Sequence, residues 1–306
     1  MPIVIPKNLP AAESLAKEKI FVMFSERAET QDIRPLEIAI LNLMPTKIET
    51  ETQLMRLLSN SPLQVNVTLL ETATYRGKHT SSEHLDAFYK SYEDVKGLKF
   101  DGMIITGAPV ETLDFYDVKY WTELEEIFDY IEENVTSTIF ICWGAQAALH
   151  YYYGISKEIL PQKKFGIFKN KRKQFEPLLK GMDDYIYIPH SRHTEINAEE
   201  LKSCSDLVVL AESTEAGISI ARSVDNSKIF LLGHSEYDRD TLKLEYERDL
   251  AKGLDIQPPA HYFTDKAHKN INMNWQSTAN LLYYNWLNYF VYQQTPYDIN
   301  QIGKKY

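Results

Sequence analysis

The fold is decided by the stretch Thr136-Ser-Thr-Ile-Phe-Ile-Cys-Trp-Gly-Ala-Gln-Ala-Ala-Leu-His-Tyr-Tyr-Tyr153. Residues 136–141 are typical of a buried strand, and the alanine-rich residues 144–153 are typical of a helix. Cys142 therefore stands at the turn between the strand and the helix. A strand, a sharp turn and a helix make the local arrangement of a nucleophile elbow. The stretch thus predicts one βα unit and one candidate nucleophile.

Two features favour a reactive thiol at Cys142, and one departure from the usual elbow pattern weakens the match. The helix that follows presents its N-terminal dipole, which favours a thiolate and lowers the pKa of a cysteine. Gly144 lets the backbone turn tightly, although the usual small residue two positions before the nucleophile is replaced by Phe140. A small buried cysteine with a packing role is the alternative. Cys204 lies in a polar stretch and is predicted to have no catalytic role.

The same alternation of strands and helices recurs on both sides of this unit. Strand and helix at this spacing predict an α/β fold with a mostly parallel sheet covered on both faces, in which the loops after the strands build the site. No clear pattern is present between residues 154 and 228. The predicted strands are 36–42, 63–70, 100–106, 136–141 and 228–234, and the predicted helices are 46–60, 84–92, 121–133, 144–153, 240–252 and 279–293.

The domain organisation is predicted to be simple. Residues 1–34 contain three early prolines and are expected to form an N-terminal arm packed on the body. Residues 35–296 are expected to form a single catalytic α/β domain, and residues 297–306 a C-terminal tail. No internal repeat and no linker interrupts this pattern.

Composition excludes several classes of protein. The chain has 306 residues, a net charge of −10 and two cysteines. The acidic balance argues against a general nucleic-acid binder, and two cysteines are too few for a disulfide framework and suit a reducing compartment. The sequence has no secretory signal pattern and no run of eighteen apolar residues. We therefore expect a soluble, cytoplasmic protein with neither a membrane nor a nucleic acid as partner.

His234 is the best candidate for a general base. It ends the apolar run 229–233, and Glu236 lies two residues beyond it. In an extended chain these two side chains project to one side, so Glu236 could orient the imidazole while His234 takes a proton. A surface histidine beside a surface glutamate is the alternative. The order Cys142, His234, Glu236, each at a strand terminus of one parallel sheet, favours a catalytic triad.

The segment His190-Ser-Arg-His-Thr-Glu195 holds three potential metal ligands in six residues. No cysteine pair or helical His-x-x-x-His accompanies them, and a triad needs no metal, so we predict no metal site. A polar substrate-binding loop is the favoured interpretation, with Ser191 and Arg192 as hydrogen-bond donors.

Four motifs stand out along the chain: Thr106-Gly-Ala-Pro109, Ile141-Cys-Trp-Gly-Ala-Gln146, His190-Ser-Arg192 and Gly233-His-Ser-Glu-Tyr237. Together they resemble the homoserine O-succinyltransferase/O-acetyltransferase family. The opening residues 1–5 and the stretch 41–46 look like this family too, and the resemblance extends to about Pro296. It implies a fold similar to class I glutamine amidotransferases, which is a flavodoxin-like doubly wound sheet, and a homodimer.

The resemblance also implies roles for individual residues. The acceptor L-homoserine, and with it a place in methionine biosynthesis, rests on the resemblance alone. Lys163 has a neighbour, Lys164, that fits the family pattern equally well. The implied roles are acyl-carrying nucleophile for Cys142, base for His234, its partner for Glu236, and substrate contacts for Lys163, Ser191 and Arg248.

The acyl donor is predicted from Glu111. In the family that the chain resembles, the residue two after the proline of Gly-Ala-Pro is glycine for succinyl-CoA and glutamate for acetyl-CoA, and here it is Glu111. A succinyl group ends in a carboxylate, and two like charges about 4 Å apart repel by roughly 4 kcal/mol at an effective dielectric near 20. A Glu111 that points to solvent would have no such effect. We predict acetyl-CoA as co-substrate and no bound cofactor.

The predicted reaction is transfer of the acetyl group from acetyl-CoA to the hydroxyl of L-homoserine through an acyl-cysteine. The backbone N–H of Trp143, with one from the 44–46 loop or from Gly107, would stabilise the oxyanion. The run 163–173 carries six basic residues in eleven and suits either the phosphates of coenzyme A or a solvated loop. The alternatives are a homoserine O-succinyltransferase, a glutamine amidotransferase-like hydrolase and a non-enzymatic binding protein.

Overall fold

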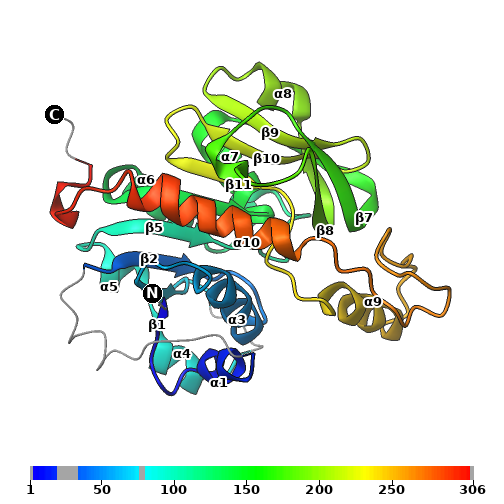
Figure 1. Ribbon diagram of the computed structural model, residues 1–306, viewed down its shortest axis with the longest axis horizontal. Coiled ribbons are helices and arrows are strands. Elements are labelled where there is room, and N and C mark those ends of the chain that lie inside the picture. Colours follow the sequence, from blue (N-terminus) through cyan, green and yellow to red (C-terminus); the bar gives the residue numbers. More distant parts are fainter. Residues whose placement is uncertain (1–2, 19–33, 76–79, 304–306) are drawn as a thin grey trace.

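The computed structural model describes residues 3–18, 34–75 and 80–303 and contains one 11-stranded sheet (Figure 1). Its strand order is β1-β3-β2-β5-β6-β11-β10-β9-β7-β8, with β4 paired to β3. The strands are β1 (Ile3–Val4), β2 (Leu36–Leu41), β3 (Val65–Leu70), β4 (Tyr89–Lys90), β5 (Phe100–Ile105), β6 (Val135–Ile141), β7 (Lys157–Arg172), β8 (Tyr185–Ile196), β9 (Leu207–Ser213), β10 (Gly217–Ser223) and β11 (Lys228–Leu231).

The parallel half of the sheet has the strand order of a doubly wound fold. Strands β3, β2, β5, β6 and β11 pair in parallel in that order. Numbered along the chain, this order is 2-1-3-4-5, the flavodoxin-like arrangement. The predicted fold class is therefore confirmed.

Alternation along the parallel strands sends side chains to two separate cores. Ile38, Ile40 and Ile104 pack in a core with the helices α1, α3 and α10. Their neighbours in sequence, such as Ala39 and Met103, pack in a second core with α6 and α7. Both faces are covered, so these strands are apolar almost throughout and not alternately polar.

The helices begin and end close to the predicted positions in the parallel half. The segment predicted as one helix over 84–92 is α4 followed by β4 and α5, and the helix predicted over 279–293 continues from α10 into a π-helical stretch, η3. The α-helices are α1 (Pro10–Lys17), α3 (Lys47–Leu58), α4 (Ser82–Phe88), α5 (Tyr92–Val95), α6 (Trp121–Asn134), α7 (Trp143–Tyr153), α8 (Ala198–Ser203), α9 (Thr241–Ala251) and α10 (Gln276–Asn285). The shorter helices are η1 (Phe115–Asp117), η2 (Pro177–Leu179), η3 (Trp286–Tyr292) and η4 (Ile299–Gln301).

An antiparallel half continues the sheet beyond β11. Strands β10, β9, β7 and β8 pair antiparallel in that order, and in Figure 1 they form the upper right of the molecule with α8. The hydrophobic pattern of residues 154–228 did not predict these strands. The basic run 163–173, for which a loop was one alternative, lies almost entirely within β7.

The N-terminal segment joins the edge of the sheet. β1 pairs in parallel with β3, and α1 contacts α3. Arg34 then forms a bidentate ion pair with Asp101 on β5, with hydrogen bonds of 2.8 and 2.9 Å. Residues 19–33 of the expected N-terminal arm lie outside the described residues. At the other end of the chain, η4 belongs to the expected tail, and the Ile302 carbonyl accepts a hydrogen bond from Lys99.

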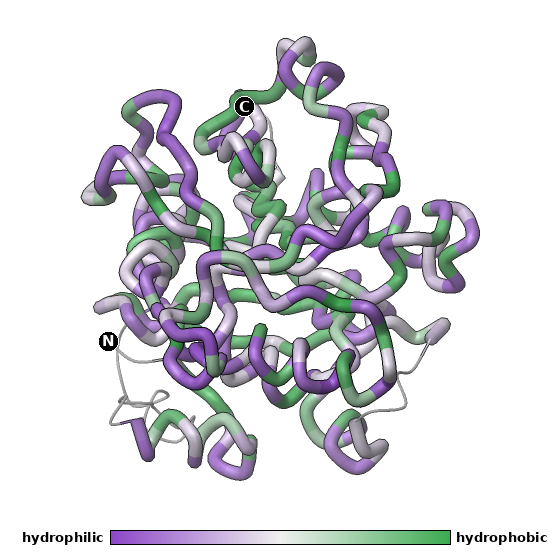
Figure 2. The backbone as a smooth tube through the Cα atoms, turned by 90° about the vertical axis from the view of Figure 1, so that its right-hand side faces the viewer, coloured by the Kyte–Doolittle hydropathy of each residue, from purple (hydrophilic) through white to green (hydrophobic). Residues whose placement is uncertain are grey.

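Hydropathy follows this architecture. In Figure 2 the hydrophobic stretches run through the middle of the molecule, while many of the outer turns are hydrophilic. Among the described residues, none of the helices combines the length and the apolarity needed to cross a membrane.

Candidate catalytic site

Cys142 occupies a sharp turn between β6 and α7. Its φ of 50° and ψ of −114° are unusual for a non-glycine residue, which marks a strained backbone position. Two backbone hydrogen bonds hold the turn: the Cys142 N–H donates to the Leu231 carbonyl at 2.7 Å, and the Gln146 N–H donates to the Cys142 carbonyl at 3.1 Å. The nucleophile-elbow geometry predicted from the sequence is present.

Close packing explains the residues around the elbow. A Cβ on Gly144 would lie 2.7 Å from the Thr106 carbonyl oxygen, so this glycine is needed for contact with the loop after β5 more than for the turn itself. Phe140, the departure from the usual elbow pattern, is accommodated because its side chain belongs to the core on the α6 and α7 side. There it stacks on Phe230 at 5.5 Å between ring centroids.

His234 and Glu236 form a buried pair beside the thiol. His234 Nδ1 and Glu236 Oε1 are 2.6 Å apart, and the two residues are 3% and 7% exposed. Burial would lower the pKa of His234, but the neighbouring Cys142 and Glu236 outweigh burial and hold that pKa well above its usual range. The surroundings therefore favour the protonated form of the His234 imidazole.

The route by which Glu236 reaches the imidazole differs from the prediction. β11 ends at Leu231, and residues 235–236 form a turn in which the Tyr237 N–H donates to the His234 carbonyl at 3.3 Å. The turn, and not an extended chain, brings the carboxylate to Nδ1. The His234 N–H is fixed by the Pro189 carbonyl at 2.8 Å.

Cys142 and His234 line a cavity of about 640 Å³, and Glu236 is not among its lining residues. The cavity is bounded by the loops that follow β2, β5, β6 and β11, which is the carboxyl edge of the parallel strands. The antiparallel strands β7 and β8 and the helix α9 close its other side. The polar and reactive lining residues include Thr46, Glu49, Glu111, Cys142, Lys163, Ser191, His193, His234, Glu245, Arg248 and Asp249.

A charged cluster lines the cavity wall formed by β7 and α9. Lys163 Nζ lies 2.7 Å from Glu245 Oε1 and 3.5 Å from Asp249 Oδ2. The Ser191 hydroxyl donates to Glu245 Oε1 at 2.9 Å, and Arg248 pairs with Asp249 at 2.7 Å. Lys163, Ser191 and Arg248 are therefore brought together, whereas Lys164 pairs with Glu195 and is not among the lining residues.

Arg192 does not take the substrate-donor position that the sequence predicted for it. The segment 190–195 is part of β8, so successive side chains point to opposite faces, and Ser191 and His193 are the residues that line the cavity. Arg192 is buried behind it and donates to the carbonyls of Thr194 and Ala216. His190 is also buried, and burial together with the Arg192 charge lowers the pKa of His190 well below its usual range.

Glu111 faces the cavity and is not directed to bulk solvent. Its Oε1 accepts a hydrogen bond from the His193 backbone N–H at 2.9 Å. Lys157 Nζ donates to the Glu111 carbonyl at 2.6 Å, which fixes the backbone of the loop after β5. The carboxylate is therefore held at the wall of the cavity into which Cys142 faces.

Sequence reasoning missed the carboxylates that accompany the basic residues. Glu245, Arg248 and Asp249 have the spacing i, i+3, i+4, which places them on one face of α9. This spacing is present in the sequence and could have predicted that the three side chains lie together.

A second group that sequence reasoning missed supports the 44–46 loop. Buried Lys47 donates a hydrogen bond to the Asn42 carbonyl, and the Asn42 amide donates one to the Lys47 carbonyl at 3.2 Å. Burial lowers the pKa of Lys47 to about 8.

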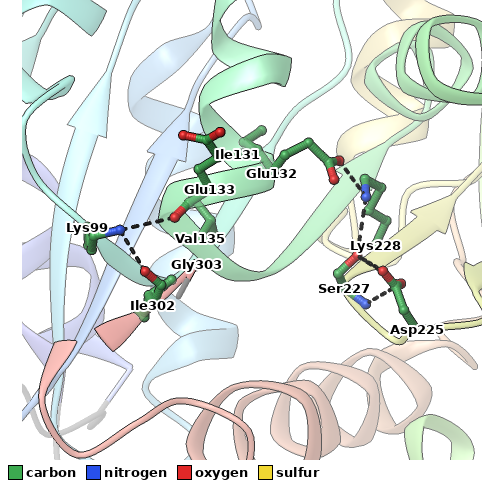
Figure 3. A pocket seen from close by; sticks show the side chains of 10 residues that line it. All are labelled: Lys99, Ile131, Glu132, Glu133, Val135, Asp225, Ser227, Lys228, Ile302 and Gly303. Atoms are coloured by element: carbon green, nitrogen blue, oxygen red, sulfur yellow. Dashed lines mark hydrogen bonds and ion pairs between the residues drawn. The ribbon is translucent and has the colours of Figure 1, made fainter. Parts of the chain in front are cut away.

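A second cavity, of about 710 Å³, lies at the opposite edge of the parallel strands (Figure 3). Lys228 contacts Glu132 at 2.6 Å, and Lys99 donates to the carbonyls of Glu133 and Ile302. The residues that the structure shows lining it include neither cysteine nor histidine. Its size alone does not make it a catalytic centre.

Within the described part of the chain, no group of three His, Cys, Asp or Glu side chains is placed to hold a metal ion.

The chain is similar to known proteins in sequence and in fold. Relatives named homoserine O-acetyltransferase from Methanomethylophilus alvi and Petrotoga mobilis are 55% and 54% identical, and each match covers 99% of both chains. A solved glutamine amidotransferase from Thermotoga maritima aligns with a TM-score of 0.56 at 12% identity, over 85% of this chain and 100% of that one, which is a likeness of fold alone. The family model described as homoserine O-succinyltransferase matches residues 2–297, and the chain belongs to that family.

Proposed function

We propose that the protein transfers an acetyl group from acetyl-CoA to the hydroxyl of L-homoserine through an acetyl-Cys142 intermediate. One observation carries the proposal: a buried thiol and an imidazole, the latter held by the Glu236 carboxylate, line a cavity whose opposite wall holds paired charges of both signs. An amino acid substrate carries an ammonium and a carboxylate, and this wall has groups for each. The name shared by its close relatives supports the same activity.

In the first half-reaction, the Cys142 thiolate attacks the thioester carbonyl of acetyl-CoA. A new sulfur–carbon bond forms, the bond to coenzyme A breaks, and the departing thiolate takes the proton from the His234 imidazolium. The negative oxygen of the tetrahedral intermediate needs donors. Trp143 N–H at the start of α7 and Gly107 N–H beside it are suited to this task, since a Cβ on Gly107 would lie only 3.2 Å from the Cys142 Cβ.

In the second half-reaction, neutral His234 removes the proton of the homoserine hydroxyl. The oxygen attacks the acetyl carbonyl, the bond to Cys142 breaks, and the thiolate–imidazolium pair is restored. Glu236 at 2.6 Å from Nδ1 keeps Nε2 available for both proton transfers. The substrate carboxylate would bind Arg248 and Lys163, and its ammonium would bind Glu245, in place of the ion pairs that these residues now make with one another.

The choice of acetyl-CoA over succinyl-CoA rests on Glu111. Its carboxylate is fixed at the cavity wall by the His193 N–H. A succinyl chain on Cys142 would bring a second carboxylate into the same half-buried space, and like charges there repel by several kcal/mol. The family model carries the succinyl name while the close relatives carry the acetyl name, so the donor needs its own test.

The proposal is tested by incubating the protein with acetyl-CoA or succinyl-CoA, without acceptor, and measuring its intact mass. We expect a gain of one acetyl group with acetyl-CoA, loss of that gain when homoserine is added, and no gain in Cys142→Ala. A succinyl adduct would keep the reaction type and overturn the donor. Glutamine hydrolysis, with no coenzyme A released from either donor in the presence of homoserine, would instead favour an amidotransferase-like hydrolase.

The donor argument has its own variant, Glu111→Gly. Removing the carboxylate is expected to raise the rate with succinyl-CoA by at least about 10-fold relative to acetyl-CoA, because the like-charge repulsion is lost. The neighbouring Thr112→Gly is the matched control, since Thr112 lines the same cavity without a charge. An unchanged donor ratio in Glu111→Gly would remove Glu111 from the argument.

We also propose a cytoplasmic location. The chemistry requires Cys142 as a free thiol, and both cysteines are unpaired in the structure. A reducing compartment keeps such thiols free.

A further inference from the structure

The ring of Tyr237 lies flat against the imidazole of His234. The two ring centroids are 4.2 Å apart and the planes differ by 12°. Tyr237 itself is buried, and it lines the cavity into which Cys142 faces. The stack therefore forms part of the wall beside the reacting atoms, yet neither proton transfer uses it.

The surroundings prevent the Tyr237 ring from turning away. The Trp275 indole N–H donates to the Tyr237 carbonyl at 2.9 Å, and Trp275 is fully buried. Tyr237 belongs to a hydrophobic cluster with Phe165, Leu242 and Tyr262. The backbone hydrogen bond and the packing of the ring in this cluster favour the orientation in which the ring faces the imidazole.

We propose that Tyr237 is a positioning residue whose ring fixes the plane of the His234 imidazole and stabilises its protonated form. The face of an aromatic ring carries partial negative charge and attracts a cation that lies over it. An imidazolium parallel to the ring at 4.2 Å meets this condition. The inference rests on the proposed use of a Cys142–His234 pair, and it adds a third source of stabilisation to the two charges already described.

The charged groups around the imidazole come from several elements. Cys142 at the start of α7 and Glu236 in the same turn favour the imidazolium. His190 on β8 is kept neutral by burial, so it adds no positive charge. Arg192 on β8 is cationic and disfavours the imidazolium, although its guanidinium is directed to the carbonyls behind the cavity.

The Tyr237 phenol remains neutral in this setting. Burial raises its pKa well above the usual range, and the neighbouring carboxylates Glu245, Glu236 and Glu111 and the Cys142 thiolate act in the same direction. The ring therefore does not change its charge over the range in which the imidazole titrates. Its effect on His234 is constant and has one sign.

The test is an NMR titration of the His234 imidazole in the full chain without substrates. Histidine-labelled protein would be assigned with His234→Asn, and the parent compared with Tyr237→Leu and Tyr237→Phe. Loss of the aromatic face should lower the pKa of His234 by roughly 0.5–1 unit in Tyr237→Leu. Tyr237→Phe lacks the hydroxyl but keeps the ring, so its His234 pKa should stay within about 0.2 unit of the value in the parent protein.

A matched control separates this effect from general loss of packing. Tyr262→Leu removes a buried ring from the same cluster without touching the imidazole, and it should lower the unfolding temperature without moving the His234 titration. Tyr237→Met replaces Tyr237→Leu if the leucine variant does not fold. An unshifted titration in the ring-free variants, or an equal shift in Tyr237→Phe, would overturn the proposal. The readout involves neither acyl donor nor acceptor, so it is independent of failure of the proposed reaction.

Discussion

The two halves of the sheet contribute different kinds of residue to the same cavity. The parallel half supplies Cys142, His234 and Glu236, which are buried and follow strands that are buried along almost their whole length. The antiparallel half, with α9, supplies Lys163 and Arg248. Lys163 is paired with Glu245 and Arg248 with Asp249, and all four residues line the cavity. In the proposed reaction, the bond-making groups would thus belong to the parallel half, and the antiparallel half with α9 would hold the groups that bind the substrate. Substitutions in the first half should change kcat, and those in the second half should change KM.

The largest effect is expected for Glu236→Gln in the parallel half. Without the carboxylate, the pKa of His234 falls, because Glu236 raises it, and the amide no longer enforces the working tautomer. We expect kcat to fall about 10²- to 10⁴-fold, with KM for homoserine changed less than about 3-fold. Steady-state kinetics measure both.

Glu176→Gln is the matched control for Glu236→Gln. Glu176 is a buried carboxylate in the other half of the molecule, and it forms a bidentate pair with Arg222 at 3.0 and 3.1 Å. Its loss should reduce the unfolding temperature and leave kcat of the folded fraction unchanged. If Glu236→Gln instead raised KM and kept kcat, the division of labour between the halves would be wrong.

A smaller effect is expected for Arg248→Lys in the recognition half. A lysine keeps the charge but cannot present the two parallel N–H groups that a carboxylate accepts. We expect KM for homoserine to rise about 10- to 100-fold while kcat changes less than about 3-fold. A fall in kcat at saturating homoserine, with KM unchanged, would contradict the comparison.

The same division explains how much the sequence predicted. In the parallel half, strands buried on both faces read as apolar runs, and β2, β5 and β6 were predicted to within one residue at each end. The elbow at Cys142 followed from a strand meeting an alanine-rich helix. The pairing of His234 with Glu236 was predicted for an extended chain, whereas it occurs in a turn. The prediction missed the turn because residue spacing alone does not reveal one.

The antiparallel half was not predictable from hydrophobic pattern. β7 includes Pro161 and a dense run of lysines, and only its central residues are buried, so its sequence reads as a loop. The strand acquires its structure from pairing with β8, which is a tertiary effect. For the same reason, the faces of β8 could not be assigned, and Arg192 was placed in the cavity although Ser191 and His193 line it.

The smallest expected effect concerns two adjacent lysines that only the strand geometry tells apart. Lys163 pairs with Glu245 in the cavity, and Lys164 pairs with Glu195 at 2.9 Å outside it. Successive residues of a strand point to opposite faces, so Lys163→Met should raise KM for homoserine about 5- to 20-fold, and Lys164→Met should change it less than about 2-fold. Equal effects of the two variants would mean that both lysines act through general charge. In that case the recognition half would attract the substrate through its overall field and not through contacts at defined positions.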